Sequence, residues 1–122
     1  MTVLLTGGAG YIGSHVAVEL LQSGYDVIIA DNFYNSSQEV PERIREITEK
    51  SVRTYNVDIQ NSAALEQIFK QHEINAVMHF AGYKAVGEAV QQPLKYYRGN
   101  LDSTLTLLET MGKYQVKNLI FS

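Results

Sequence analysis

The sequence predicts an α/β fold, a doubly wound parallel sheet with helices on both faces. Three observations predict it. Short apolar runs alternate with helical patterns, the runs are apolar at nearly every position, and a glycine cluster follows the first run. Repetition of strand, helix and strand implies parallel strands joined by right-handed crossovers. We therefore expect a Rossmann-type sheet whose first five strands run in the order 3-2-1-4-5, with ligands beyond the carboxyl ends of strands 1 and 4.

The first two strands and the helix between them are predicted over residues 3–30. Residues 3–5 form the first strand and residues 27–30 the second. The helix between them ends at Gly24, because glycine commonly follows the last helical turn. The apolar residues of this helix recur at helical spacing and are expected to be buried: Ile12, Val16, Leu20 and Leu21.

The second helix is predicted to begin near Pro41, a residue that suits a first helical position. Ile44 and Ile47 are expected on its buried side. The charges between Glu39 and Arg53 alternate in sign, which is typical of a solvated helix face.

Residues 52–57 predict the third strand. Asn61 or Ser62 is expected to cap the helix that follows, since both residue types accept a hydrogen bond from the first turn. The buried side of this third helix is expected to hold Leu65, Ile68 and Phe69.

Residues 76–80 predict the fourth strand and residues 82–92 a loop. Pro93 then opens a long helix, and residues 118–122 are interpreted as a buried fifth strand. Because the chain ends inside that apolar run, we expect it to be the front part of a longer protein, a complete small domain being the alternative. The buried side of the long helix is expected to hold Leu94, Tyr97, Leu101, Leu105 and Leu108.

Composition excludes several classes of function. The 122 residues fit one domain, and a net charge of −3 gives no reason to expect a nucleic-acid or anionic membrane partner. The chain has no cysteine and only three scattered histidines, which argues against a metal site. No apolar run approaches the roughly 20 residues of a membrane span. We expect a cytoplasmic protein.

The glycine cluster places Gly7, Gly10 and Gly13 at three-residue spacing, after a strand and at the start of a helix. One glycine permits the tight turn, another lets the backbone approach a pyrophosphate, and the third lets the helix pack on the sheet. We expect the amides of Tyr11 and Ile12 to contact the phosphates. The alternative, a turn that binds nothing, is disfavoured by this strand–loop–helix context.

Asp31 ends the second strand, near the offset of about 20 residues expected of a ribose-binding acid. Its carboxylate can accept hydrogen bonds from an adenosine ribose and would repel a 2′-phosphate, which favours NAD over NADP. The alternative is a turn-forming aspartate. Asn32, Asn35 and Ser36 extend the same rim, where they either bind ribose or phosphate or shape the turn.

Polar or small residues also follow the third strand. Asp58 and the backbone of Ile59 lie where adenine would rest, although Asp58 is equally suited to help cap the next helix.

Small and basic residues follow the fourth strand in the same way. Ala81 and Gly82 permit a close approach of the backbone, and Lys84 could reach the phosphates or the nicotinamide ribose. A lone lysine in a loop is more often simply solvated. His79, within an apolar strand, is interpreted as a core histidine rather than a catalytic base.

Residues 7–15, GGAGYIGSH, together with 31–32 and 35–36, resemble the extended short-chain dehydrogenase/reductase family. Residues 79–88, HFAGYKAVGE, make the chain similar to the UDP-glucose 4-epimerases within that family. The match continues at Val90, Pro93, Leu94, Tyr96, Tyr97 and Asn100.

The resemblance implies a reversible interconversion of UDP-glucose and UDP-galactose through a 4-keto sugar. Tightly held NAD takes hydride from sugar C4 and returns it to the other face, and a tyrosine removes the hydroxyl proton. A UDP-sugar substrate and a homodimer of the full-length protein are implied as well. The implied cofactor contacts are Tyr11, Ile12, Asp31, Asn32, Asn35, Ser36, Asp58, Ile59, Phe80, Ala81, Gly82 and Lys84.

The chain departs from the family pattern in three ways. Gly99 stands where the family often has a cofactor-binding asparagine, while Asn100 beside it is retained as a cofactor contact. Ser103 replaces a common glycine. No tyrosine is followed four residues later by lysine, so we assign no catalytic residue within the chain.

Residues 1–122 are therefore interpreted as an NAD-binding Rossmann domain, incomplete at its C-terminal end and without the substrate domain. Two alternatives remain open. One is a different NAD-dependent nucleotide-sugar epimerase or dehydratase, and the other is a non-catalytic NAD-binding module.

Overall fold

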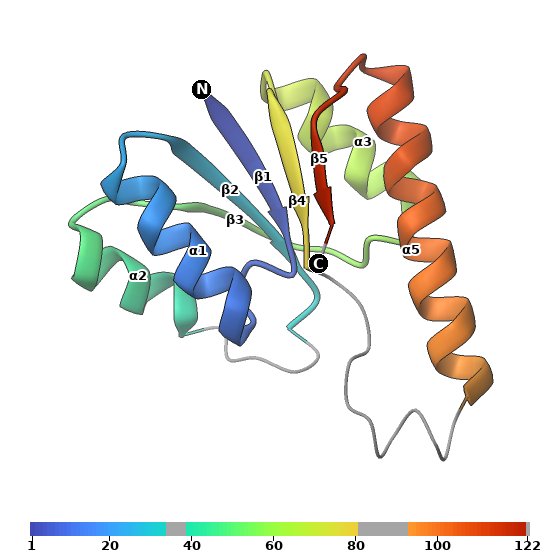
Figure 1. Ribbon diagram of the computed structural model, residues 1–122, viewed down its shortest axis with the longest axis horizontal. Coiled ribbons are helices and arrows are strands. Elements are labelled where there is room, and N and C mark those ends of the chain that lie inside the picture. Colours follow the sequence, from blue (N-terminus) through green and yellow to red (C-terminus); the bar gives the residue numbers. More distant parts are fainter. Residues whose placement is uncertain (34–38, 81–92, 122) are drawn as a thin grey trace.

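The protein, described by a computed structural model, has a five-stranded parallel sheet in the order β3-β2-β1-β4-β5 (Figure 1). The predicted strand order is confirmed. The structure describes residues 1–33, 39–80 and 93–121, without the side chains of Tyr96 and Tyr97, so the predicted loop at 82–92 lies outside it. The strands are β1 (Thr2–Thr6), β2 (Asp26–Asp31), β3 (Arg53–Asn56), β4 (Ala76–His79) and β5 (Leu119–Phe121). The helices are α1 (Tyr11–Gln22), α2 (Val40–Thr48), α3 (Ser62–Gln71) and α5 (Pro93–Lys113).

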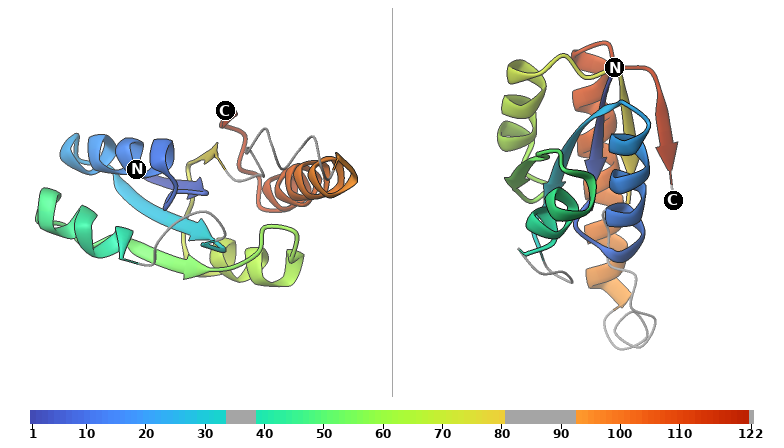
Figure 2. Two further views of the ribbon diagram at one scale, coloured as in Figure 1. Left: turned by 90° about the horizontal axis from the view of Figure 1, so that it is seen from below. Right: turned by 90° about the vertical axis from the view of Figure 1, so that its left-hand side faces the viewer.

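Helices cover both faces of the sheet, and successive residues of one strand serve opposite layers. Leu5 of β1 packs in a core with α1 and α2, whereas its neighbour Leu4 packs with α3 and α5. Figure 2 shows α1 and α3 on opposite sides of the sheet. The central strands β1 and β2 are therefore apolar at every position between their two ends, as the sequence pattern indicated.

Helix α1 approaches the sheet through its smallest residues. Gly13, Ala17 and Leu21, spaced four residues apart, form its buried face. Ile12 is 55% exposed, so its predicted burial is wrong. The close approach at Gly13 turns the larger neighbouring side chain outward. The helix ends as predicted, with Gly24 in the left-handed region at φ +92°.

Helix α2 buries one side chain, Ile44, which is 2% exposed. Ile47 is 61% exposed, so the prediction that both isoleucines are buried is wrong. Ile47 instead lies at the margin of the helix, where it lines a groove between α1 and α2.

Among the residues described, no helix is both long and apolar enough to cross a bilayer.

Helix α5 buries a different face from the one predicted. Leu94, Leu101, Leu105 and Leu108 are between 41% and 68% exposed, and the side chain of Tyr97 is outside the description. Besides Gly99, the buried positions described combine two hydroxyl residues with two apolar ones, a mixture that apolar periodicity alone does not detect. They are Ser103, Leu107, Thr110 and Met111.

Strand β5 is shorter and more exposed than predicted. It covers Leu119–Phe121 and pairs with β4. Ile120 is 58% and Phe121 63% exposed, so the expectation of a buried strand is wrong for these two residues, whereas Leu119 is half-buried against the core. The reason is its place at the end of the strand order, where β4 is its neighbour in the sheet.

Helix α3 has the three buried residues predicted for it, Leu65, Ile68 and Phe69. The side chain of Asn61 caps it, accepting a hydrogen bond from the amide of Ala64 at 3.1 Å. Of the two residues proposed as the cap, the structure thus selects Asn61.

The capping bond predicts a difference between two adjacent alanine variants. Asn61→Ala should lower the free energy of unfolding by about 1 kcal/mol, because it leaves a first-turn amide without its partner. Ser62→Ala is the matched control, since Ser62 is an exposed first helical residue and should change stability little. Urea unfolding followed by circular dichroism measures both. Equal effects of the two substitutions would contradict the assigned cap.

Candidate functional site

The carboxyl ends of the strands meet at one edge of the sheet, the lower edge in Figure 1, and the glycine loop lies there. Gly7 follows β1 in the left-handed region at φ +73°, and its amide donates to the carbonyl of Ala30 on β2 at 2.8 Å. The amide of Gly10 donates back to the carbonyl of Gly7 at 3.1 Å. The loop is thus a closed turn anchored to both central strands.

Gly10 and Gly13 of the loop are glycine for different physical reasons. A Cβ on Gly13 would lie 2.5 Å from the carbonyl oxygen of Gly7 and 2.8 Å from the Cα of Gly8, so the fold itself requires glycine there. A Cβ on Gly10 would meet only that carbonyl, at 3.4 Å, among the residues described. The chain's own packing therefore leaves Gly10 open, which suits a group approaching from outside.

The N-terminus of α1 points at this edge with its first amides available. Its N-cap is Gly10, which has no side chain to accept a hydrogen bond from the first turn. The amides of Tyr11 and Ile12 belong to that turn, and both side chains are exposed. The ring of Tyr11 lies 4.7 Å from that of His15, centroid to centroid. Uncapped amides and the helix dipole make this end suitable for an anion.

The carboxylate of Asp31 fastens the glycine loop to the end of β2. One oxygen accepts from the amide of Ala9 at 3.0 Å and the other from the amide of Phe33 at 2.6 Å. We call this pair of bonds the Asp31 clasp. Phe33 is held in the left-handed region at φ +58°. Asp31 is only 8% exposed, and each carboxylate oxygen keeps a further lone pair for a ligand hydroxyl.

The two residues predicted near adenine have structural partners as well. The Oδ1 atom of Asp58 accepts from the amide of Gln60 at 2.9 Å, and its carbonyl accepts from the amide of Asn61 at 2.9 Å. Asp58 therefore shapes the turn that leads into α3. The side chain of Ile59 is 4% exposed and belongs to the core. The carboxylate of Asp58 remains exposed at the edge of the sheet.

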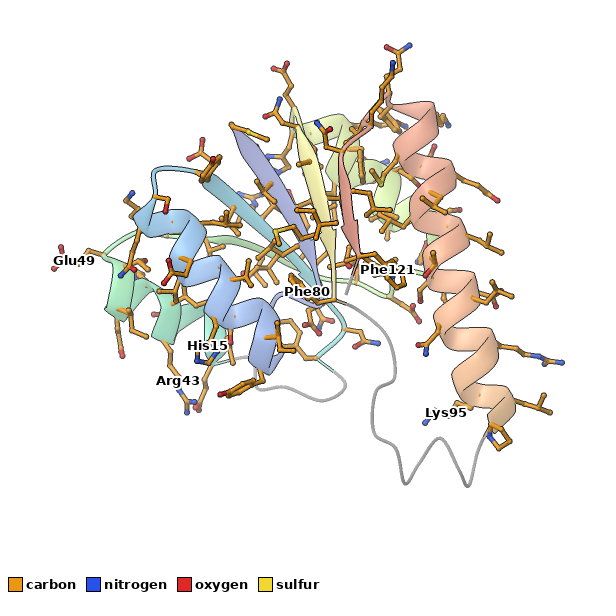
Figure 3. The ribbon with its side chains drawn as sticks, in the orientation of Figure 1. His15, Arg43, Glu49, Phe80, Lys95 and Phe121 are labelled. Carbon is orange, nitrogen blue, oxygen red and sulfur yellow. The ribbon has the colours of Figure 1, made fainter. Side chains whose placement is uncertain are left out.

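His79 is a core histidine, as predicted. It is 2% exposed, with Nδ1 2.5 Å from the hydroxyl of Thr6 and Nε2 3.3 Å from that of Thr104 on α5. Sequence reasoning missed both threonines, because their pairing depends on which strands and helices adjoin. The amide of Phe80 donates to the carbonyl of Thr6 at 2.7 Å, and Figure 3 shows Phe80 at the same edge.

The structure brings most of the predicted cofactor residues to this edge. The glycine loop, Asp31 and the exposed Asn32 adjoin one another, and Asn100 is exposed on α5. The other five predicted residues lie outside the described residues: Asn35, Ser36, Ala81, Gly82 and Lys84.

A groove of about 560 Å³ lies between α1 and α2, beside the glycine loop. Ala9, Gly10 and Tyr11 form one end of it, and His15 and Arg43 lie at its rim (Figure 3). The sequence analysis assigned Gly10 and Tyr11 to the cofactor and did not identify this groove. Its residues come from the glycine loop and from two helices, α1 and α2, whose packing against each other no local pattern specifies.

The sequence is similar to a family of NAD-dependent enzymes and to individual members of it. Residues 3–122 match a model of the NAD dependent epimerase/dehydratase family. The UDP-glucose 4-epimerase of Bacillus subtilis (strain 168) is 53% identical over 122 residues, and that of Mus musculus is 53% identical over 126 residues. These alignments cover 100% and 98% of this chain but only 36% of each relative.

Solved structures show the same relationship in three dimensions. UDP-glucose 4-epimerase from Bifidobacterium longum, in complex with NAD+ and UDP, superposes with a TM-score of 0.98 at 52% identity, covering 100% of this chain and 36% of that one. The enzyme from Stenotrophomonas maltophila, with bound NAD and formylated UDP-arabinopyranose, gives 0.96 at 43% identity, covering 99% and 36%. The chain belongs to the NAD dependent epimerase/dehydratase family.

Proposed function

We propose that the full-length protein is an NAD-dependent epimerase that interconverts UDP-glucose and UDP-galactose at sugar C4, and that this chain carries its NAD-binding part. The observation that carries the proposal is the similarity to UDP-glucose 4-epimerases at 53% identity over the whole chain. The chain spans about a third of the length of those relatives. The curated relatives compared are named as epimerases, which favours this activity over a dehydratase or a non-catalytic module.

The described residues fit the cofactor. Gly10 has room for an approaching phosphate, the first amides of α1 can donate to it, and the Asp31 clasp keeps lone pairs for the adenosine ribose. A carboxylate at the ribose favours NAD over NADP. The residues proposed to bind NAD are Gly7, Gly10, Tyr11, Ile12, Gly13, Asp31, Asn32, Asn35, Ser36, Asp58, Ile59, Phe80, Ala81, Gly82, Lys84 and Asn100.

In this proposal the residues of this chain bind and orient the NAD, and they do not move the proton of the C4 hydroxyl. NAD supplies the group that accepts hydride from C4 and returns it. The glycine loop holds the pyrophosphate, and the strand ends hold the two nucleoside halves on either side of the switch point between β1 and β4. The tyrosine that takes the C4 hydroxyl proton is proposed to lie in the part of the protein outside this chain.

The direct test is turnover by the full-length protein. UDP-galactose should be converted to UDP-glucose, measured with a coupled UDP-glucose dehydrogenase assay, and nucleotide extracted from the denatured protein should be NAD rather than NADP. Residues 1–122 alone should show no turnover and serve as the control. No conversion by the full-length protein would refute the proposed activity, and extracted NADP would refute the role given to Asp31.

Alanine substitutions at Gly10 and Gly13 should have different effects, the first on NAD binding and the second on the stability of the fold. Gly10→Ala should leave the unfolding midpoint of the NAD-free protein nearly unchanged but reduce the NAD retained after dialysis at least about tenfold, because its methyl group occupies the space of the pyrophosphate. Gly13→Ala should instead lower the thermal unfolding temperature, because its methyl group meets the backbone of Gly7 and Gly8. Full NAD retention in a folded Gly10→Ala protein would contradict the phosphate-binding role of the loop.

We also propose that the full-length protein is a homodimer that acts in cytoplasmic galactose metabolism. The dimer is supported by an exposed row of leucines on α5, Leu94, Leu101, Leu105 and Leu108. Their spacings of seven, four and three residues are typical of a helix–helix seam. Galactose metabolism follows from the proposed substrate pair.

Sedimentation of the full-length protein tests the dimer. The unmutated protein should sediment as a dimer, and Leu101→Glu should shift it toward monomer because a charge in an apolar seam is costly to bury. Lys117→Glu, an exposed residue beyond α5, is the control and should leave the dimer intact. A monomeric unmutated protein would rule out the dimer.

A further inference from the structure

A polar bridge joins three elements that meet near the glycine loop: Thr6 and His79 in it are buried, and Thr104 is half-buried. The imidazole of His79, at the end of β4, lies between the hydroxyls of Thr6 on β1 and Thr104 on α5, at 2.5 and 3.3 Å. A neutral imidazole has one donor and one acceptor, and a hydroxyl can serve as either, so the two threonines satisfy both ring nitrogens. We call this set the Thr6–His79–Thr104 bridge. Its first member directly precedes Gly7.

The bridge joins α5 to the carboxyl end of β4. The C-terminal part of α5 is anchored in the core by Leu107 and Met111, which are 0% and 4% exposed. Toward its N-terminus the helix extends past the carboxyl edge of the sheet (Figure 1). The bond between Thr104 and His79 of β4 therefore ties the projecting part of α5 to the sheet.

Asn100 lies on the projecting part, four residues before Thr104, so the two residues share one side of the helix. α5 connects β4 to β5, on the side of the switch point opposite to the strand that carries Asp31. In a doubly wound sheet the dinucleotide lies across the switch point. With the adenosine half at Asp31, the nicotinamide half lies on the side of α5.

We propose that the Thr6–His79–Thr104 bridge positions α5 relative to the glycine loop, and thereby holds Asn100 in place at the nicotinamide half of the cofactor. This inference rests on the proposed function. His79, Thr6 and Thr104 are positioning residues, because they act through the helix and the loop. Loss of the bridge should impair hydride transfer more than retention of the cofactor, since the Asp31 clasp and the α1 amides hold the other half.

The full-length protein, loaded with NAD, allows a matched test on one helix. Thr104→Val removes the bridging hydroxyl and should lower kcat at least about fivefold, the effect of losing one hydrogen bond, while NAD retention after dialysis stays within about twofold. Thr104→Ser keeps the hydroxyl and should restore kcat. Thr110→Val is the control, because Thr110 lies on the same helix, is more buried than Thr104 and donates its hydroxyl within the helix, to the carbonyl of Thr106 at 2.9 Å. Thr6→Val, which removes the other hydroxyl of the bridge, should repeat the loss of kcat.

The outcomes separate positioning from simple stability. A loss of kcat in Thr104→Val and Thr6→Val but not in Thr110→Val, with thermal unfolding temperatures lowered in all three, supports the proposal. Unchanged kcat in Thr104→Val, or an equal loss in Thr110→Val, overturns it while leaving the proposed function intact. Absence of epimerase activity in the unmutated protein overturns both.

Discussion

The contact between the start of α1 and the glycine loop is the constraint on which the rest of the site depends. Gly13 packs so closely on the backbone of Gly7 and Gly8 that a single added carbon has no room. This contact fixes the direction of α1, whose N-terminus then points at the edge where all the strands end. The availability of the first amides of α1 for a phosphate is a consequence of that packing.

The Asp31 clasp gives the site its shape before any ligand is considered. Its carboxylate accepts from Ala9 in the loop and from Phe33 beyond β2, so the glycine loop and the end of β2 are held together by one side chain. Phe33 is kept in a left-handed conformation that a non-glycine residue adopts at a cost. Such preorganisation lowers the entropy lost when a ligand binds. It also means that Asp31 cannot be exchanged to alter cofactor preference without disturbing the loop.

Helix α5 has one face that packs on this domain and another that is exposed. The face that packs on this domain contains Ser103 and Thr110 beside Leu107, and Thr104 next to it bonds to His79. The more apolar row of leucines is exposed. A polar residue in the contact between α5 and the rest of the domain is tolerated when its polar group has a hydrogen-bond partner. The leucine row, in contrast, has the spacing of a contact between two helices.

The sequence by itself determined the element types, the strand order, the glycine loop and the position of Asp31. The element types follow from local periodicity, the loop and Asp31 from the spacing between glycines and acid, and the strand order from the right-handed crossovers of repeated strand–helix–strand units. Only the tertiary structure decided which face of a helix is buried and which side chains pair across the sheet. Leu105 is more apolar than Thr110, yet Thr110 is buried. Likewise, His79 finds Thr6 and Thr104 at separations of 73 and 25 residues. Burial and pairing depend on which surfaces the sheet and helices present to one another, and that information is not contained in any single segment of the chain.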